Sequence, residues 1–242
     1  MQAIMLKLKC ITNLHVGSGD VNYNIIDNEV EKDSITGYPV INASGVKGAL
    51  REYFNRNHEL SAELIDSIFG SETKDQTTSG RLKFLEADML TIPVRASSGD
   101  SAYYMISTSR ALDKYVECCK IFFDKDIKYA EEEEQGKSVE GIALTKKTQL
   151  LGEEIHLISD EEFEDVPLPV VARNKLENGI SQNLWYEEIV PHESVFYLSV
   201  IAGGKDEGLL ETFRNAIDKK VVQFGANASI GYGLCTVTVV EG

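Results

Sequence analysis

The stretch GVKGALREYF, residues 45–54, has the sequence pattern of an amphipathic helix. Its apolar residues recur at helical spacing and are Val46, Leu50, Tyr53 and Phe54. A face of this kind predicts a helix that packs against a core. At its start, Asn42 and Ser44 are both suitable N-caps, because short polar side chains accept hydrogen bonds from the first helical amides.

The same helix carries a basic face. Lys47 and Arg51 are four residues apart and therefore lie side by side, next to the apolar stripe. We place Lys47 in the first turn, near unpaired backbone amides that favour anions, with Ser44 and Gly45 at the helix start. A ribose-phosphate chain crossing this point would meet all of these groups. The alternative interpretation is an ordinary solvated face.

Two glycine-rich loops lie on either side of this helix in the sequence. LHVGSG, residues 14–19, contributes His15, Gly17 and Ser18, and QFGANASIGYG spans residues 223–233. The candidate contacts in the second loop are Gly225, Asn227, Gly231 and Gly233. Such loops let a backbone approach phosphates closely. An isolated Gly-x-Gly is also typical of a simple turn, and no Rossmann, Walker A, GxSxG or HExxH pattern is present.

The remaining periodicity predicts an α+β fold. Alternation of apolar and polar residues predicts strands over 4–10, 80–84, 92–95, 102–106, 166–172, 194–201 and 234–240. Helical spacing predicts further helices over 61–69, 109–122 and 209–217. This order suits a palm of the ferredoxin or RNA-recognition type, with inserted elements, as a single domain over residues 1–242.

Three segments interrupt that palm. A polar loop over about 17–40 is long for a compact domain, and loops of this length are commonly functional. The Glu-rich segment 124–165 is weakly periodic, and we interpret it as an inserted subdomain or a lid. Residues 173–183 have the turn residues of an extended hairpin, with Arg173 and Lys175 as its basic residues.

The acidic residues of the long loop are Asp20, Asp27, Glu29, Glu31 and Asp33. Composition alone does not choose among them. A carboxylate next to an RNA phosphate is electrostatically unfavourable, because both groups are negatively charged. We therefore expect a carboxylate at such a position to have a function. It could hold a divalent cation, or orient a ribose 2′-OH for attack on the neighbouring phosphate.

The overall charge limits how RNA could be bound. There are 24 basic and 39 acidic residues, so the net charge is −15 and binding by diffuse charge is disfavoured. The four cysteines have no CxxC spacing, which indicates reduced, mostly buried thiols in a cytoplasmic protein. No apolar run approaches the roughly 20 residues of a membrane span. MQAIMLKLKC at the N-terminus has the pattern of a strand rather than a signal peptide.

An ordered set of motifs resembles the RAMP proteins of CRISPR systems, and more narrowly the backbone subunit of the type III-B Cmr complex. The motifs are LHVGSG (14–19), TGYPVINASGVKGALR (36–51), FG (69–70), GRLKFLEADML (80–90), IPVR (92–95), LWYEEIVPHESVFY (184–197) and FGANASIGYG (224–233). IPVR followed by an aromatic strand, and the LWYEE segment, favour this subunit over its type III-A counterpart.

The resemblance implies a function. Such subunits stack into a helical filament on CRISPR RNA, together with other Cmr subunits. A thumb-like hairpin displaces nucleotides at regular intervals, and the complementary single-stranded target RNA is cut beside each displacement. Aligned through residues 36–39, the family's catalytic aspartate falls on Asp27, and a divalent cation, Mg²⁺ or Mn²⁺, is the implied cofactor. The hairpin over 173–183 is the implied thumb.

The sequence also departs from the family pattern. The family's PGSSLKGALR is NASGVKGALR here, and its final GG(D/N)xTxGxG loop is GANASIGYG. These changes keep helix and turn chemistry but leave room for reduced cleavage. A guide-binding scaffold without cleavage is therefore an alternative, as is the type III-A subunit. A third alternative, an enzyme acting on a phosphorylated metabolite, would use the glycine loops as its phosphate cradle.

Overall fold

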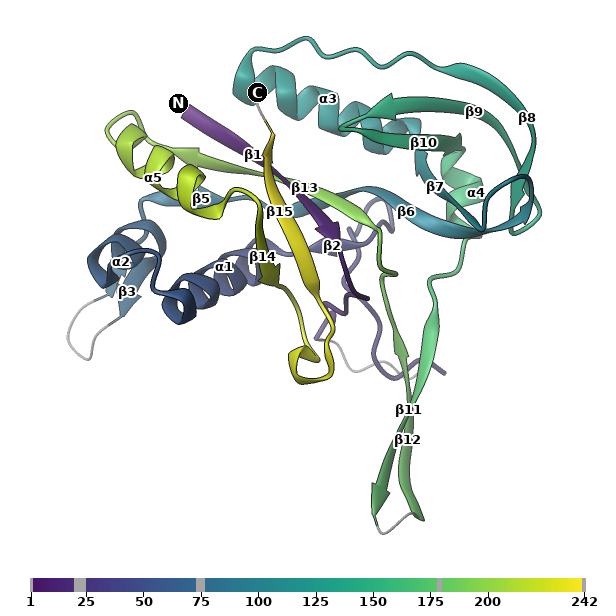
Figure 1. Ribbon diagram of the computed structural model, residues 1–242, viewed down its shortest axis with the longest axis horizontal. Coiled ribbons are helices and arrows are strands. Elements are labelled where there is room, and N and C mark those ends of the chain that lie inside the picture. The colour runs from purple at the N-terminus through teal and green to yellow at the C-terminus, as the bar shows by residue number, and fades with distance from the viewer. Residues whose placement is uncertain (1, 20–24, 73–76, 178–179, 241–242) are drawn as a thin grey trace.

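A mixed sheet with helices on both faces forms the body of the molecule (Figure 1). This computed structural model describes the chain over residues 2–19, 25–72, 77–177 and 180–240. The central strands follow the order β14, β15, β1, β13, β6, each antiparallel to its neighbours. Their bounds are Lys220–Gln223 for β14, Leu234–Val240 for β15, Gln2–Cys10 for β1, Val195–Ala202 for β13 and Ala87–Ser98 for β6. The α+β class expected from the sequence is confirmed.

Strand β1 lies in the middle of this sheet. Leu6 is opposite Leu198 of β13 on one side and Val239 of β15 on the other. Leu6 and Leu8 are buried on one face, and Met5 is buried on the other, in a second core. The period of two seen in the sequence therefore separates two buried faces, because helices cover the sheet on both sides.

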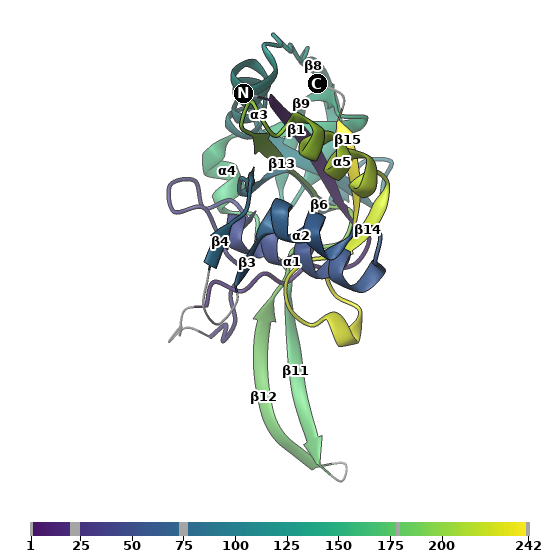
Figure 2. The same cartoon turned by 90° about the vertical axis from the view of Figure 1, so that its left-hand side faces the viewer.

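Three helices pack on one face of the sheet, on the side that Figure 2 turns toward the viewer. They are α1 (Ala43–Asn57), α2 (Ala62–Phe69) and α5 (Glu207–Ile217). Phe54 of α1 and Phe213 of α5 have ring centroids 5.8 Å apart, and Phe69 stacks on Phe84 at 5.1 Å. Such aromatic pairs add roughly 0.5–1.5 kcal/mol each beyond the area that they bury.

Helix α3 (Ser109–Phe123) covers the opposite face. Its Tyr115 meets Tyr197 of β13 edge to face, with centroids 5.0 Å apart. Thr108 caps the helix by accepting a hydrogen bond from the Ala111 amide at 3.2 Å. Ser61 caps α2 in the same way through the Leu64 amide, as its position before the apolar run predicts.

The start of α1 differs from the expected one. Asn42 occupies the N-cap position, but its side chain makes no capping hydrogen bond. Ser44 lies inside the helix and is not its cap. Because the helix begins at Ala43, Lys47 lies in the second turn rather than the first, just beyond the unpaired amides of the helix start.

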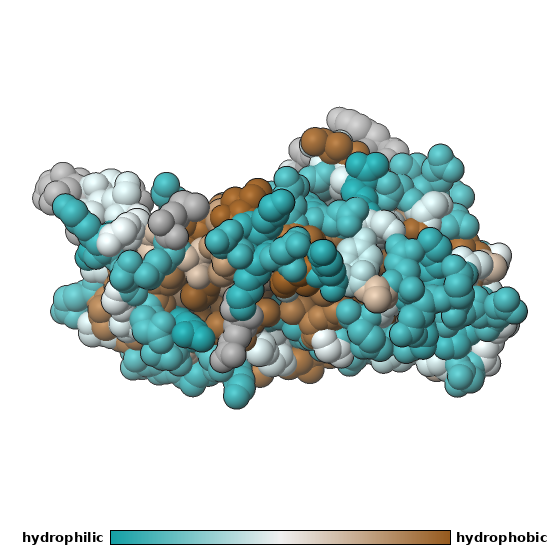
Figure 3. Space-filling model, turned by 90° about the horizontal axis from the view of Figure 1, so that it is seen from above, coloured by the Kyte–Doolittle hydropathy of each residue, from teal (hydrophilic) through white to brown (hydrophobic). Residues whose placement is uncertain are grey.

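The Glu-rich segment after α3 extends the sheet. It forms β8 (Glu132–Val139), β9 (Ile142–Leu150), β10 (Glu153–Ile158) and the short helix α4 (Asp160–Glu164). β10 pairs in parallel with β7 (Tyr103–Thr108), which is antiparallel to β6. Seen from above, this end of the molecule is covered mainly by hydrophilic residues (Figure 3, right). The sequence did not predict these strands.

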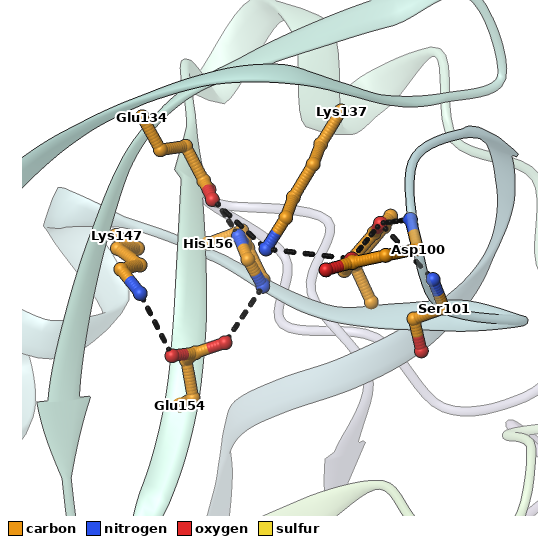
Figure 4. Close-up of polar contacts among 8 residues, drawn as sticks. Asp100, Ser101, Glu134, Lys137, Lys147, Glu154 and His156 are labelled. Carbon is orange, nitrogen blue, oxygen red and sulfur yellow. Dashed lines mark hydrogen bonds and ion pairs between the residues drawn. The ribbon is translucent and has the colours of Figure 1, made fainter.

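A buried polar cluster fastens β8 to β10 (Figure 4). His156 of β10 is 2% exposed, and its Nδ1 contacts a carboxylate oxygen of Glu134 in β8. Its Nε2 lies 3.6 Å from Glu154, and Lys137 is 3.3 Å from Glu134. β8 changes register between residues 133 and 137, so this cluster holds the strands together where the ladder is interrupted.

A long two-stranded hairpin projects from the body (Figures 1 and 2). It consists of β11 (Val170–Glu177) and β12 (Ile180–Glu188), which pair antiparallel. The extended hairpin predicted over 173–183 is therefore present and longer than expected. The strand predicted over 166–172 begins later than predicted, at Val170. Pro167 and Pro169 have no amide hydrogen to donate to a neighbouring strand.

The remaining strands are short: β2 (Val40–Ile41), β3 (Gly70–Glu72), β4 (Thr77–Ser79) and β5 (Leu82–Phe84). The four cysteines are free thiols, and Cys10, Cys119 and Cys235 are buried, as predicted. Within the described ranges, every helix is too short or too polar to cross a bilayer.

Candidate functional site

The segment that contains Asp27 is attached to the root of the hairpin. The Asp27 and Asn28 amides donate to the Tyr186 carbonyl at 3.0 and 3.1 Å. The Glu188 amide donates to the Asn28 carbonyl at 2.9 Å, and Asn28 bridges Glu187 in parallel. Residues 27–28 therefore run beside β12 like a short third strand.

The Asp27 carboxylate is fixed at one oxygen and exposed to solvent. Its Oδ2 accepts a hydrogen bond from the Tyr186 amide at 2.8 Å. Among the described residues, none bonds to Oδ1. An oriented, exposed carboxylate can accept a proton from a hydroxyl group that lies within hydrogen-bonding distance.

Glu187 is a buried carboxylate shared by three segments. Its two oxygens accept from Arg173 Nε at 2.9 Å and from Asn227 Nδ2 at 2.7 Å. His15 Nε2 lies 3.7 Å away. The Arg173 guanidinium also lies over the Tyr232 ring, 4.6 Å from its centroid. Glu187 thus ties the hairpin to both glycine-rich loops.

Glu188 is buried beside it and holds the long loop. Its carboxylate accepts from Lys32 Nζ at 2.9 Å and from the Val30 amide at 3.1 Å. Its carbonyl accepts from His15 Nδ1 at 2.7 Å. His15, which we expected to bind RNA, is 5% exposed and its ring serves contacts within the protein.

The two glycine-rich loops contact each other, and two glycines permit this. The Ala226 amide donates to the His15 carbonyl at 2.8 Å, and the Gly233 amide donates to the Asn13 carbonyl at 2.7 Å. Gly225 and Gly233 both have positive φ, and a Cβ at either would collide with a backbone carbonyl. Glycine is therefore required at both positions for steric reasons that involve no ligand.

The other predicted residues of the two glycine-rich loops lie near the point where these loops contact each other. Gly17 bridges Val30 of the long loop, and the Ser18 amide donates to the Glu29 carbonyl at 3.2 Å. Gly231 has positive φ, and a Cβ added there would meet open space. The loop that joins β14 to β15 and the hairpin project on the same side of the body (Figure 1).

A second group of predicted residues lines a separate groove. This groove of about 550 Å³ runs between α1 and the β3–β5 region and includes Ser44, Lys47, Arg51 and Lys83. Among the described side chains, no carboxylate pairs with Lys47. Arg51 pairs with Asp66 at 3.3 Å, but both side chains are about half exposed, so the pair is weak. The groove is a basic surface on an acidic protein.

Two further predicted residues lie outside these groups. Gly45 is on the exposed side of α1 but does not line the groove, and Lys175 is exposed far along the hairpin. Of the other acidic candidates in the long loop, Asp33 stabilises a turn through its side chain. Burial opposes the shift, but hydrogen bonds from the Thr36 and Ile35 amides lower the pKa of Asp33. Asp20 lies outside the described residues.

The residues that assemble this site were not predicted from the sequence. Glu187 and Glu188 appeared only as part of a motif, and Tyr186 acts through its backbone. One signal was available, because two glutamates directly before the apolar Ile189 and Val190 end a strand inside the core. Charged residues are rarely buried without partners, so such a position indicates a polar network.

The comparisons with known proteins agree on one family. The CRISPR system Cmr endoribonuclease Cmr4 of Pyrococcus furiosus is 25% identical over an alignment of 286 positions, gaps included, which covers 100% of this chain and 97% of that protein. A structure of Type III-B Cmr-beta bound to cognate target RNA matches with a TM-score of 0.80 and 19% identity, covering 99% and 97%. Oligomeric Cmr4 from Pyrococcus furiosus matches with a TM-score of 0.73 and 22% identity, covering 100% and 99%.

The family model agrees with these likenesses. It is described as the RAMP superfamily, and it matches residues 7–236, from the middle of β1 to the start of β15. The match therefore includes the central strands of the sheet, the hairpin and both groups of candidate residues. The chain belongs to the RAMP superfamily.

Proposed function

We propose that the chain is a backbone subunit of a type III-B CRISPR effector complex that cleaves target RNA. Its full-length relative is named a Cmr endoribonuclease, and its fold matches a Cmr-beta complex bound to target RNA. Its partners are then CRISPR RNA, single-stranded target RNA, further copies of itself and other Cmr subunits. The observation that carries the proposal is the exposed Asp27 carboxylate at the root of the projecting hairpin.

We assign the guide-binding surface to the groove beside α1. Lys47 and Arg51 present cations, and Ser44 adds a hydroxyl group. The phosphate backbone has the same chemistry at every nucleotide, so these groups bind a guide without reading its bases. Base pairing with the guide then selects the target.

The finer assignments rest on topology. The order β15, β1, β13, β6, with α1 after β1 and α5 after β13, supports a ferredoxin-like palm. The hairpin of β11 and β12 is the proposed thumb, since it projects from the body. The β8–β10 extension is the proposed lid, and its hydrophilic, Glu-rich surface would keep it clear of RNA phosphates.

Asp27 would promote transesterification within the target strand. Oδ1 would accept the proton of a ribose 2′-OH, and the 2′-oxygen would bond to the adjacent phosphorus. The bond from phosphorus to the 5′-oxygen of the next nucleotide would break, and that oxygen would take a proton from solvent. The products would be a 2′,3′-cyclic phosphate and a 5′-hydroxyl.

The part of the chain that the structure describes does not by itself supply a complete site for the proposed Mg²⁺ or Mn²⁺. Among the described residues, no three carboxylate, histidine or cysteine side chains converge to hold a metal ion. A cation near Asp27 would need most of its ligands from RNA phosphates and water. Target cleavage measured with and without EDTA tests whether the reaction needs the cation.

The experiment is target cleavage by the reconstituted complex with Asp27→Asn. This change keeps the size of the side chain but removes the proton acceptor, so cleavage should fall by at least about a hundredfold. Asp33→Asn is the matched control, since an amide oxygen can still accept at the turn, and it should cut normally. Persistent cutting by Asp27→Asn at the same positions would refute the assignment. A wild-type complex that binds target but never cuts would indicate a scaffold.

A further inference from the structure

Asp27 is held by the hairpin itself. Its backbone amide donates to the Tyr186 carbonyl at 3.0 Å, and its Oδ2 accepts from the Tyr186 amide at 2.8 Å. One residue of β12 thus grips Asp27 through both its main chain and its side chain. A displacement of the hairpin root would carry the carboxylate with it.

The Tyr186 amide is available because it is not part of the hairpin ladder. Tyr186 lies opposite Ala172, and its amide and carbonyl both point to residues 27–28. In antiparallel strands, hydrogen-bonded and non-bonded pairs alternate. The neighbouring pair, Arg173 and Trp185, is therefore the one that bonds the strands, and the Tyr186 amide can serve Asp27 alone.

We propose that the main-chain amide of Tyr186 is a positioning group that aims the Asp27 carboxylate at the scissile ribose. The inference rests on the proposed function. An exposed aspartate has a broad χ2 distribution, so an unanchored carboxylate would sample many orientations. Anchoring Oδ2 fixes the direction in which Oδ1 points. The anchoring amide belongs to the same hairpin that we propose displaces the nucleotide. The cleaved bond therefore has a fixed position relative to the displaced nucleotide.

The positioning group is a main-chain amide, so the test has to remove that amide and not the side chain of Tyr186. Tyr186→Pro removes the amide hydrogen and no ladder bond, so the hairpin should persist. Leu184→Pro is the matched control, since Leu184 lies opposite Asn174 in the equivalent non-bonded position of the same strand. Among the described residues, none accepts a hydrogen bond from the Leu184 amide. Tyr186→Phe and Tyr186→Ala keep the amide and change only the side chain.

The measurement is single-turnover cleavage at saturating target RNA, together with the target Kd. We expect Tyr186→Pro to cleave about ten- to a hundredfold more slowly with an unchanged Kd, because the carboxylate is misdirected while RNA binding is intact. Leu184→Pro, Tyr186→Phe and Tyr186→Ala should cleave within about twofold of wild type.

Two outcomes would overturn the inference. One is wild-type cleavage by Tyr186→Pro, and the other is an equal loss in Leu184→Pro, which would indicate a general distortion of the hairpin. The proposed function fails separately, if the wild-type complex does not cut or if Asp27→Asn cuts normally. A dead Asp27→Asn with an unaffected Tyr186→Pro would therefore reject only the positioning role.

Discussion

Glu187 is nearly inaccessible to solvent, yet it carries a carboxylate with donors from two different segments. Replacing it with alanine would leave the partly buried guanidinium of Arg173 and the partly buried amide of Asn227 without their acceptor. Removing one partner of such a buried pair costs about 3–5 kcal/mol. We expect Glu187→Ala to lower the free energy of unfolding by that amount in urea denaturation.

The control for Glu187→Ala is the same substitution at an exposed ion pair. Glu52 pairs with Arg56 one helical turn away, and both side chains are more than half exposed. Glu52→Ala should change stability by no more than about 0.5 kcal/mol. Equal losses in the two variants would show that the carboxylate of Glu187 does not organise the site.

The glycine loop offers a second comparison between residues. Gly231 and Gly233 both have positive φ, but a Cβ at Gly231 meets open space, whereas one at Gly233 meets the Phe224 carbonyl. Gly231→Ala should cost about 1–2 kcal/mol from backbone strain alone. Gly233→Ala should cost distinctly more, because the main chain must also move. Thermal denaturation of the two variants measures the difference, and equal melting temperatures would contradict it.

At the scale of elements, the attachment of β8 depends on the cluster around His156. Glu134→Gln removes the charge that faces the imidazole, where a hydrogen bond to a charged group contributes roughly 1.5–3 kcal/mol. Amide hydrogen exchange in β8 should accelerate at least about tenfold, while β1 and β13 stay protected. Glu132→Gln, at an exposed position of the same strand, should leave exchange unchanged. Uniform acceleration in all strands would rule out a local role.

At the scale of the whole molecule, RNA affinity has to arise against a net charge of −15. Each lost phosphate contact lowers the slope of log K against log salt by about 0.7 for a single strand. Lys47→Ala should therefore weaken guide binding and reduce the slope by this amount. Lys128→Ala removes a lysine that is 83% exposed, outside the groove, and should change neither quantity. Titrations at several salt concentrations test both, and an unchanged slope for Lys47→Ala would exclude the groove.

The sequence predicted those parts of the fold that local patterns determine. β15 has the predicted bounds, and α2 ends at Phe69 as predicted but begins at Ala62, one residue later than predicted. β8 to β10 were missed because glutamates interrupt their alternation and because β10 joins β7 through a parallel, non-local pairing. Such pairings leave no short-range signal in a sequence.

The candidate site likewise contains residues that could be predicted from the sequence and residues that could not. Asp27 was identified through the resemblance, and Lys47 and Arg51 through helical spacing. The partners of Asp27 could not be predicted, because a backbone amide has no residue signature and Tyr186 is 159 positions away in the chain. His15 and Gly225 were read as ligand contacts, whereas their neighbours in the structure show them holding two loops together.

The central position of β1 has a consequence for how the chain folds. Both of its partners, β13 and β15, are synthesised long after it, and Leu6 pairs with Leu198 and Val239. During translation this apolar strand leaves the ribosome without either neighbour. The sheet closes only after residues 195–240 have been synthesised, and non-local pairing of this kind makes folding slow. Until then, the nascent chain exposes a strand with two unpaired edges, which favours chaperone binding.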